Sequence, residues 1–159
     1  MLTIRPATIN DVPLLKTLIC ELAAYEQELD SVAIQESDLE RDGFGEDPKF
    51  QALIAEWDAQ PAGYALFFDF YSTWTGRHLF LEDLFVRPEF RSHGIGRAML
   101  ATVAKIARAA GCSAMRWEVL GWNQSAISFY RSVGAEFLDD WKLVILKENA
   151  LEQLAGTAA

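Results

Sequence analysis

A mixed α/β fold, with one central sheet and helices on both of its faces, is what the sequence predicts for this chain of 159 residues. Three strand patterns follow one another between residues 50 and 86 with short turns between them, which is typical of an antiparallel meander. A strong helical pattern then joins the third of these strands to a fourth at 113–120. Such a crossover makes the two strands that it joins parallel. The sheet is therefore expected to be antiparallel in the middle, with one parallel pair.

The first quarter of the chain predicts a strand and two helices. Leu2 to Arg5 has the alternation of a short strand, which Pro6 ends. Thr8 to Asp11 has the spacing of a capping box, and leucines at helical spacing behind it predict a helix to about Tyr25. Ser37 to Arg41 predicts a second, shorter helix.

The antiparallel meander is expected to consist of three apolar strands. These are Phe50 to Trp57, Tyr64 to Tyr71 and Leu79 to Val86. Asp58 to Gly63 and Ser72 to Arg77 have the composition of turns and separate the strands.

The second half of the chain alternates helices and strands. An apolar stripe predicts a long helix from Gly94 to Ala110, followed by a strand from Ser113 to Leu120. Asn123 can cap a helix that runs to Ser132. Phe137 to Leu146 is expected to carry the last strand or pair of strands, and Glu148 to Leu154 a short tail helix.

Composition indicates one domain over residues 1–159, without linker or repeat, because half of the residues are hydrophobic and can form a sizeable core. The apolar runs are too short to span a membrane, and the N-terminus lacks the pattern of a signal peptide. We therefore expect a cytoplasmic protein. Cys20 and Cys112 lie in apolar surroundings and are expected to be buried free thiols.

The chain is acidic, with 23 acidic and 14 basic residues and a formal charge of −9. Such a charge disfavours nucleic acid and anionic membranes as partners and suits a cationic one. The alternative is that the acidity serves solubility alone. No metal site is expected. His78 and His93 are expected at the surface or in loops rather than as catalysts.

A glycine-rich turn, Arg91 to Gly96, lies between a predicted strand and a predicted helix. Glycines allow a ligand to approach the backbone, and a helix start offers unpaired N–H groups to an anion. Arg91 and Arg97 add positive charge. A phosphate-bearing ligand is the functional hypothesis, and a plain helix cap is the alternative. The spacing fits neither a Walker loop nor a dinucleotide fingerprint.

With these residues in view, the sequence resembles the GCN5-related N-acetyltransferase (GNAT) superfamily, whose pyrophosphate loop has the pattern Arg/Gln-x-x-Gly-x-Gly/Ala. The resemblance covers nearly the whole chain and is closest to diamine (spermidine/spermine) and thialysine acetyltransferases. The shared blocks are ELAAYE (21–26), DGFGEDP (42–48), YSTWTGR (71–77), LEDLFV (81–86) and GWNQSAISFYRSVGA (121–135).

The resemblance implies a GNAT-type sheet whose parallel strands splay apart around acetyl-CoA. The residues that it assigns to the cofactor are Leu84, Phe85 and Val86 for the pantetheine, Arg91, Ser92, His93, Gly94, Ile95, Gly96 and Arg97 for the pyrophosphate, and Asn123, Gln124, Ser125 and Ala126 for the opposite side. Tyr130 matches a catalytic tyrosine that protonates the departing thiolate. The alternative for Tyr130 is a core aromatic beside Phe129.

Glu82 and Asp83 interrupt an otherwise apolar strand, and buried carboxylates are costly unless they are paired or used. A β-bulge would let both face the cleft. Amines arrive protonated, with a pKa near ~10.4, so acetyl transfer needs a base. Glu82 could take the proton directly or through water, and Asp83 could hold a cationic amine. The alternative is a structural pair bridged to arginine.

The resemblance also assigns residues to the amine acceptor. Tyr25 and Glu26 match positions that line the family's amine site, and Glu118 and Asp140 lie near other acceptor contacts. The chain departs from these relatives here, since its loop before Trp141 is shorter and Glu118 stands where they have an apolar residue.

The function predicted from these residues and from the resemblance is acetyl transfer from acetyl-CoA to a primary amine of a small cationic metabolite. Di- or polyamines and lysine-like amines such as thialysine are the candidates. The alternatives are acetylation of a protein or peptide amino group, and a non-catalytic acyl-CoA-binding module. Because relatives are homodimers, the resemblance implies a homodimer.

Overall fold

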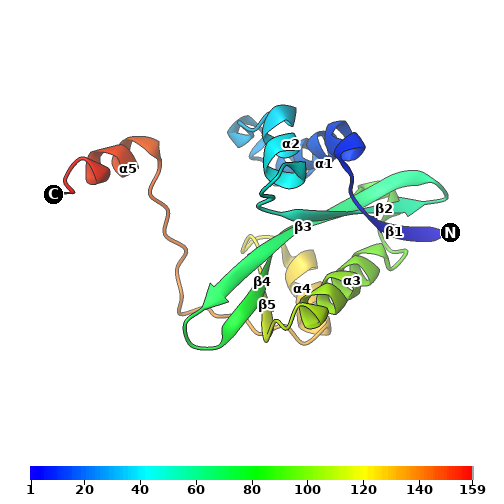
Figure 1. The fold of residues 1–159 in the computed structure, drawn as a ribbon. Helices are drawn as coiled ribbons and strands as arrows, with labels where there is room; N and C mark the ends of the chain where they lie inside the picture. Colours follow the sequence, from blue (N-terminus) through cyan, green and yellow to red (C-terminus); the bar gives the residue numbers. More distant parts are fainter. Residues whose placement is uncertain (159) are drawn as a thin grey trace. The chain divides into compact units, whose positions relative to one another are not determined.

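The computed structural model describes residues 1–158 and places a five-stranded sheet in the first of two compact units, Met1–Glu118 and Val119–Ala159. The strands lie in the order β1-β2-β3-β4-β5 (Figure 1). Their bounds are β1 Leu2–Pro6, β2 Gln51–Trp57, β3 Gln60–Ser72, β4 Gly76–Val86 and β5 Ala114–Arg116. The first four strands are antiparallel to their neighbours, and β4 and β5 are parallel, which confirms the predicted fold class.

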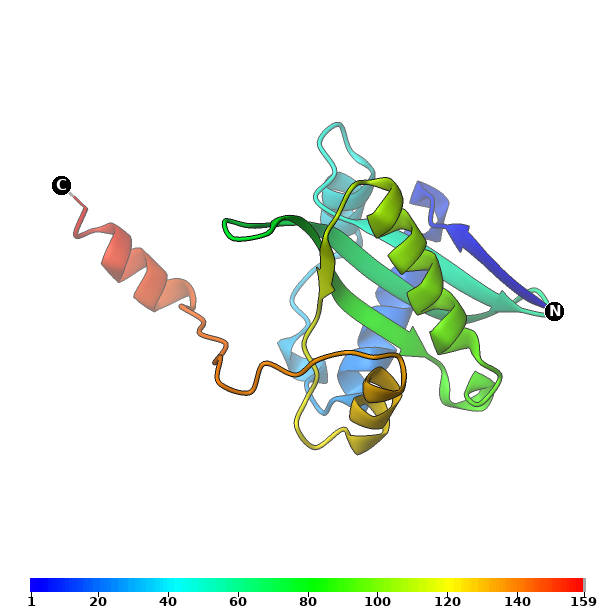
Figure 2. The same cartoon turned by 90° about the horizontal axis from the view of Figure 1, so that it is seen from below.

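Helices cover both faces of this sheet. In the first unit, α1 and α2 lie on one face and α3 on the other, where it crosses the strands (Figures 1 and 2). The bounds are α1 Val12–Tyr25, α2 Glu36–Phe44 and α3 Ile95–Ala109, with 3-10 turns at Ile9–Asp11, Leu29–Ser31 and Pro88–Phe90. The second unit holds α4 Gln124–Ser132 and α5 Glu148–Ala155. The predicted helices are thus present.

Each face of the sheet has its own core. Leu15 and Leu18 of α1 pack with Ile54 and Tyr64 on one face. Ile95 and Met99 of α3 pack with alanines of β2 and β3 on the other face. Because successive strand residues point to opposite faces, β2 and β3 can supply both cores and are nearly wholly apolar. This burial on both faces fixes the meander between two helical layers.

A partly buried ion pair fixes the entry to α1. Asp11 accepts hydrogen bonds from the Thr8 backbone N–H at 2.8 Å and from two nitrogens of Arg5 at 2.8 and 2.9 Å. The Arg5 guanidinium and the Thr8 donors hold the pKa of Asp11 well below its usual range, against the effect of burial. The predicted capping spacing therefore joins the first strand to the first helix.

The parallel pair is shorter than predicted. Pairing between β4 and β5 covers only His78 to Phe80 and Ala114 to Arg116, whereas the sequence predicted a strand to Leu120. Beyond Phe80, β4 continues to Val86 and pairs only with β3, so the other edge of this stretch carries no strand among the described residues. The predicted splay of the two parallel strands is consistent with this free edge.

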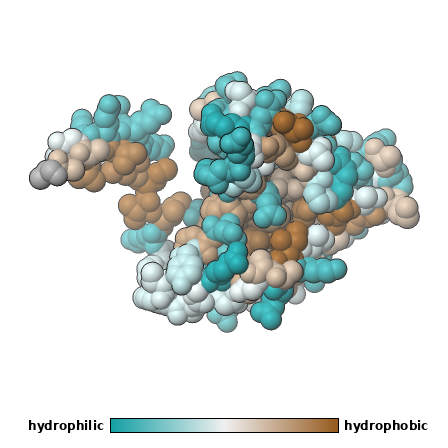
Figure 3. All heavy atoms as spheres, in the orientation of Figure 1, coloured by the Kyte–Doolittle hydropathy of each residue, from teal (hydrophilic) through white to brown (hydrophobic). Residues whose placement is uncertain are grey.

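The last predicted strand is wrong. Residues 137–146 contain no strand within the described chain, although their sequence is apolar and β-prone. A strand needs a neighbouring strand for its backbone hydrogen bonds, and none of the strand pairs among residues 1–158 includes this segment. Its side chains are therefore exposed, as for Leu143 (77%) and Val144 (86%). Figure 3 shows brown, hydrophobic spheres along the segment that leads to α5.

The prediction for His78 is also wrong, because its side chain is only 3% exposed. It lies within β4, where Nε2 is 2.7 Å from Thr75 Oγ1. Neighbouring aromatic rings, such as Phe70 at 6.2 Å, shield it from solvent. His93 is exposed, as predicted. Both cysteines are free, with Cys112 buried and Cys20 only half buried. No helix in residues 1–158 is long and apolar enough to cross a membrane.

Gly63 provides a test of the sheet. A Cβ at this position would lie 2.2 Å from the Phe85 carbonyl oxygen on the neighbouring strand. We expect Gly63→Ala to lower the free energy of unfolding by about 1–3 kcal/mol, since the two backbones must move apart. Gly121→Ala, which meets no atom within 4 Å, is the control. Chemical denaturation that gives equal stabilities for the two variants would contradict the close approach.

Candidate active site

A β-bulge interrupts β4 at the two adjacent carboxylates. In the ladder with β3, Leu66 pairs with Asp83 and Phe67 pairs with Leu81, so Glu82 is the extra residue. A bulge bends its strand and breaks the strict alternation of side chains. The predicted bulge is therefore confirmed.

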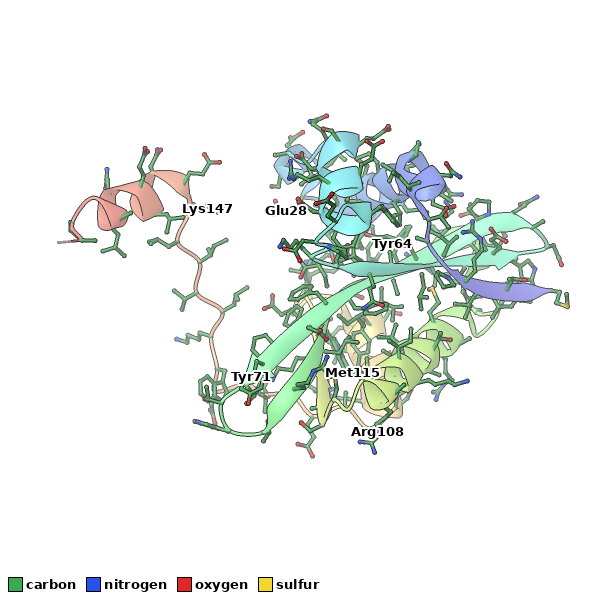
Figure 4. The ribbon with its side chains drawn as sticks, viewed as in Figure 1. Glu28, Tyr64, Tyr71, Arg108, Met115 and Lys147 are labelled. Atoms are coloured by element: carbon green, nitrogen blue, oxygen red, sulfur yellow. The ribbon has the colours of Figure 1, made fainter. Side chains whose placement is uncertain are left out.

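A tyrosine in the protein interior forms a hydrogen bond with Asp83. The Tyr64 hydroxyl donates a hydrogen bond of 2.8 Å to Asp83 Oδ2, and Tyr64 itself is 0% exposed. Figure 4 labels Tyr64 between α1 and the sheet. Sequence analysis placed Tyr64 in an apolar strand and missed this contact. The available clue was that a buried tyrosine hydroxyl needs a polar partner.

Burial and neighbouring carboxylates raise the pKa of Glu26, Glu82 and Asp83. Burial, then the charges of Asp83 and Glu118, raise the pKa of Glu82, although Glu82 is an exposed residue by its accessible surface. Burial and Glu26 raise the pKa of Asp83, against the lowering effect of the Tyr64 hydrogen bond. Burial and Glu28 raise the pKa of Glu26. Because such effects weaken with distance, these couplings link Glu26, Glu82, Asp83 and Glu118 into one acidic cluster.

No salt bridge of the described chain involves this cluster. Arg87, the residue that follows β4, is paired with another carboxylate. Its guanidinium donates to both Glu21 carboxylate oxygens at 2.7 and 2.8 Å and to the Pro61 carbonyl. The cluster is thus chemically suited to a cation from outside the chain.

The glycine-rich turn has the geometry of an anion site. Gly94 caps α3 with φ of +75°, a conformation that favours glycine. Gly96 has no such backbone requirement, and a Cβ there would meet only Val86 Cγ2, at 3.8 Å. The protein therefore leaves open space in front of Gly96. The first N–H groups of α3 have no carbonyl partner within the helix.

Two side chains shape the turn before α3. His93 Nδ1 lies 2.8 Å from the Arg91 carbonyl oxygen, and its ring contacts Trp57 at 4.8 Å. Arg91 Nε donates to the Val86 carbonyl at 3.0 Å, and its guanidinium lies 4.7 Å from the Tyr25 ring centre. Arg91 thus ties the turn to β4, the strand that carries Glu82 and Asp83, and to the end of α1, which Glu26 follows.

The remaining residues that were predicted to form the site belong to the second unit, and their surroundings are given within that unit. Asn123 caps α4, since its Oδ1 accepts from the Ala126 N–H at 3.1 Å. Tyr130 is 8% exposed and its ring lies 5.2 Å from that of Phe129. Asp140 is exposed in a turn. The described residues contain no group of three or more potential metal ligands arranged to hold an ion.

Comparison with known proteins gives this geometry a family. The acetyltransferase (GNAT) family profile matches residues 17–135. Thialysine N-epsilon-acetyltransferase of Sus scrofa is 41% identical and covers 96% of each chain. Spermidine/spermine N(1)-acetyltransferase-like protein 1 of Homo sapiens is 38% identical over 96% of this chain and 23% of its own length. An integron cassette protein from the V. cholerae mobile metagenome shares the fold, with a TM-score of 0.80, 23% identity and 98% of both chains covered.

The chain therefore belongs to the GNAT family of acetyltransferases. It is an N-acetyltransferase, which transfers an acetyl group to an amine of a small metabolite, and GNAT enzymes take this group from acetyl-CoA.

The residues present fit acetyl-CoA. The open space at Gly96 and the N-terminus of α3 suit a pyrophosphate, and the free edge of β4 suits the amides of a pantetheine arm. In binding there, the pantetheine would compete with Arg91 for the Val86 carbonyl.

Gly96 offers a direct test of this fit. Gly96→Val is expected to weaken binding of coenzyme A by roughly tenfold or more, about 1.4 kcal/mol, because the methyl groups fill the space in front of the helix start. Thermal stability should be unchanged or higher, since glycine is a poor helix former. Ala101→Val, at an exposed position of the same helix, is the control. Titration calorimetry that gives wild-type affinity for folded Gly96→Val would contradict the assignment.

Proposed function

We propose that the acceptor is a primary amine of a small cationic metabolite, either a di- or polyamine or a lysine-like amine such as thialysine. The observation that carries this proposal is the acidic cluster of Glu26, Glu82, Asp83 and Glu118, which has no salt-bridge partner in the described chain. Two of its members, Glu82 and Asp83, lie in the stretch of β4 that no longer pairs with β5. A substrate with two ammonium groups supplies the missing positive charge. The names of the relatives support the same acceptor class.

In this proposal the donor is held mainly by backbone. Residues 91–97 bind the pyrophosphate, Leu84, Phe85 and Val86 pair with the pantetheine, and residues 123–126 contact the opposite side. Bound acetyl-CoA supplies the activated acetyl thioester. The support is the open space at Gly96 and the unpaired edge of β4.

Glu82 is proposed as the base. The ammonium form of the acceptor cannot attack, so one proton must leave before the C–N bond forms. Glu82 receives it, directly or through water, while Asp83, Glu26 and Glu118 retain the cationic remainder. The raised pKa of Glu82 makes it a better proton acceptor than an ordinary carboxylate. Its exposed side chain can reach a substrate.

Tyr130 is proposed to give its proton to the thiolate as the C–S bond breaks. The support is its position in α4, two turns after the Asn123 cap, within the region that matches the family. Asp140 and Tyr25 are proposed as further acceptor contacts. The match spans residues 17–135 and thus parts of both units, which supports one catalytic domain over residues 1–159.

A homodimer and a cytoplasmic location complete the proposal. Leu143, Val144 and Ile145 expose 71–86% of their surface in a β-prone segment, which suits pairing with a second copy. Two free cysteines suit a reducing compartment.

A panel of amines tests the acceptor. We expect release of coenzyme A with diamines, polyamines and thialysine to exceed that with monoamines of equal length at least roughly tenfold in kcat/KM, because a second ammonium gains a charge-assisted contact. Thiol release is the measurement, and hydrolysis without amine is the blank. Faster turnover on peptide amino groups would favour the protein-acetylating alternative. If no amine of the panel releases thiol above the blank, a non-catalytic binding module is favoured.

Glu82→Gln tests the base through its pH dependence. Turnover should fall most near neutral pH and recover as the pH approaches the amine's own pKa, where solvent supplies the neutral nucleophile. Because burial and neighbouring charges raise the folded pKa of Glu82, its ionised form costs stability once the pH exceeds that pKa. Glutamine should therefore not destabilise the protein at neutral pH.

The control for this variant is Glu89→Gln, an exposed carboxylate close to the same strand. Profiles of kcat against pH, normalised by folded fraction, separate the hypotheses. Wild-type and Glu82→Gln profiles that differ by one constant factor at every pH would assign Glu82 to structure rather than to proton transfer.

A further inference from the structure

Tyr64 connects the core of the protein to the acidic cluster. Its ring lies in the core that α1 forms against the sheet, 6.4 Å from the ring of Phe85, and is fully buried. Its hydroxyl donates to Asp83 Oδ2 at 2.8 Å. A close-packed core fixes the ring and therefore the position of its hydroxyl. The hydrogen bond then fixes the position of the Asp83 carboxylate.

The hydrogen bond acts on the charge of Asp83. A donor favours the ionised form of a carboxylate, whereas burial and a nearby negative charge favour the protonated form. At Asp83 burial and Glu26 raise the pKa, and Tyr64 lowers it. Burial and Asp83 raise the pKa of Tyr64 well above its usual value, so Tyr64 remains protonated and keeps donating.

The charge of Asp83 in turn acts on Glu82. The bulge places these two residues next to each other outside the regular ladder. After burial, the charge of Asp83 is the largest cause of the raised pKa of Glu82. A chain of three contacts thus runs from the core through Tyr64 and Asp83 to Glu82.

We propose that Tyr64 is a positioning residue of the acceptor site: its hydroxyl holds Asp83 ionised and oriented, and through that charge it sets the pH at which Glu82 can accept a proton. This inference rests on the proposed function, in which Glu82 takes the proton of the amine. No role of Tyr64 in the sheet requires the hydroxyl, because its ring alone fills the core.

The other charged groups near Tyr64, Asp83 and Glu82 can be assigned to particular elements and partners. Glu26 and Glu28 approach from the end of α1, and Glu118 from beyond β5. The nearby cations are engaged, Arg87 by Glu21 and Arg91 by Val86 and Tyr25. The Tyr64 hydroxyl is therefore the one hydrogen-bond donor to Asp83 that the described residues provide.

Tyr64→Phe tests the inference, because it keeps the ring and removes the donor. Asp83 should then hold its proton to higher pH. Two effects on catalysis are expected. First, KM for a diamine rises by roughly threefold to tenfold, because Asp83 loses its negative charge. Second, the acid limb of the kcat profile moves to lower pH, because Glu82 loses the negative charge of Asp83 beside it and keeps only that of Glu118.

Variants of the partner and of a matched tyrosine provide the controls. Asp83→Asn should show the same shift of the acid limb, and adding Tyr64→Phe to it should shift the limb no further. Tyr71→Phe, an exposed tyrosine of the same strand, should change neither KM nor the limb. The profiles are measured with two diamines of different basicity. An acid limb that is due to Glu82 lies at the same pH for both diamines, whereas a limb that is due to ionisation of the substrate differs between them.

Carboxyl carbon NMR of the protein without acceptor measures the same coupling independently of acetyl transfer. In Tyr64→Phe the Asp83 titration should move to higher pH and the Glu82 titration to lower pH. Replacing Tyr64 by 3-fluorotyrosine, which keeps the ring and is a stronger donor, should move both in the opposite directions. If the phenylalanine variant fails to fold, the 3-fluorotyrosine protein alone tests whether the Tyr64 hydroxyl sets the two titrations.

Unchanged titrations of both carboxylates in either folded variant would overturn the inference, whatever the amine panel gives. An activity loss that only follows the folded fraction would overturn it as well. Shifted titrations in a protein that acetylates no amine would support the coupling and overturn the proposed function alone.

Discussion

The end of the β4–β5 ladder is the constraint on which the site depends. Pairing stops at Phe80, and the bulge at Glu82 follows two residues later on the same strand. From there to Val86, one edge of β4 is free while β3 still holds the other edge in place. In the proposed function, a single stretch of strand thereby offers a rigid backbone edge to one substrate and two carboxylates to the other. Ordered positioning of two reactants is what a direct transfer reaction requires.

Carboxylates elsewhere in the chain are treated differently from those in the acidic cluster. Asp11 is bridged by Arg5, which lowers its pKa, and Glu21 is bridged by Arg87. These pairs tie β1 to α1 and α1 to the end of β4. In the cluster the described residues form no such bridge, and burial raises the pKa of Glu26, Glu82 and Asp83 instead. Charges that are destabilised within the folded protein typically mark sites where an outside cation or a proton is exchanged.

Sequence patterns predicted what depends on local geometry. The capping residues of α1, the glycine start of α3 and the bulge at Glu82 each follow from residue types within a few positions of one another. Errors arose where distant segments decide. Residues 137–146 have a strand's composition but no strand beside them, and His78 is covered by rings from another strand. The Tyr64 contact also joins separate strands, and so it could not be inferred from spacing.

The different roles proposed for the two adjacent acids, Glu82 and Asp83, depend on the difference between their surroundings. Asp83 faces the α1 side, is mostly enclosed and receives a hydrogen bond that favours its charge. Glu82 is the bulged residue, is exposed to solvent and receives no such donor, so its proton affinity rises with the charge beside it. A pair of identical, equally solvated carboxylates would share one proton and do neither task well. The bulge and the buried tyrosine make the pair unequal, and this inequality separates holding a cation from accepting a proton.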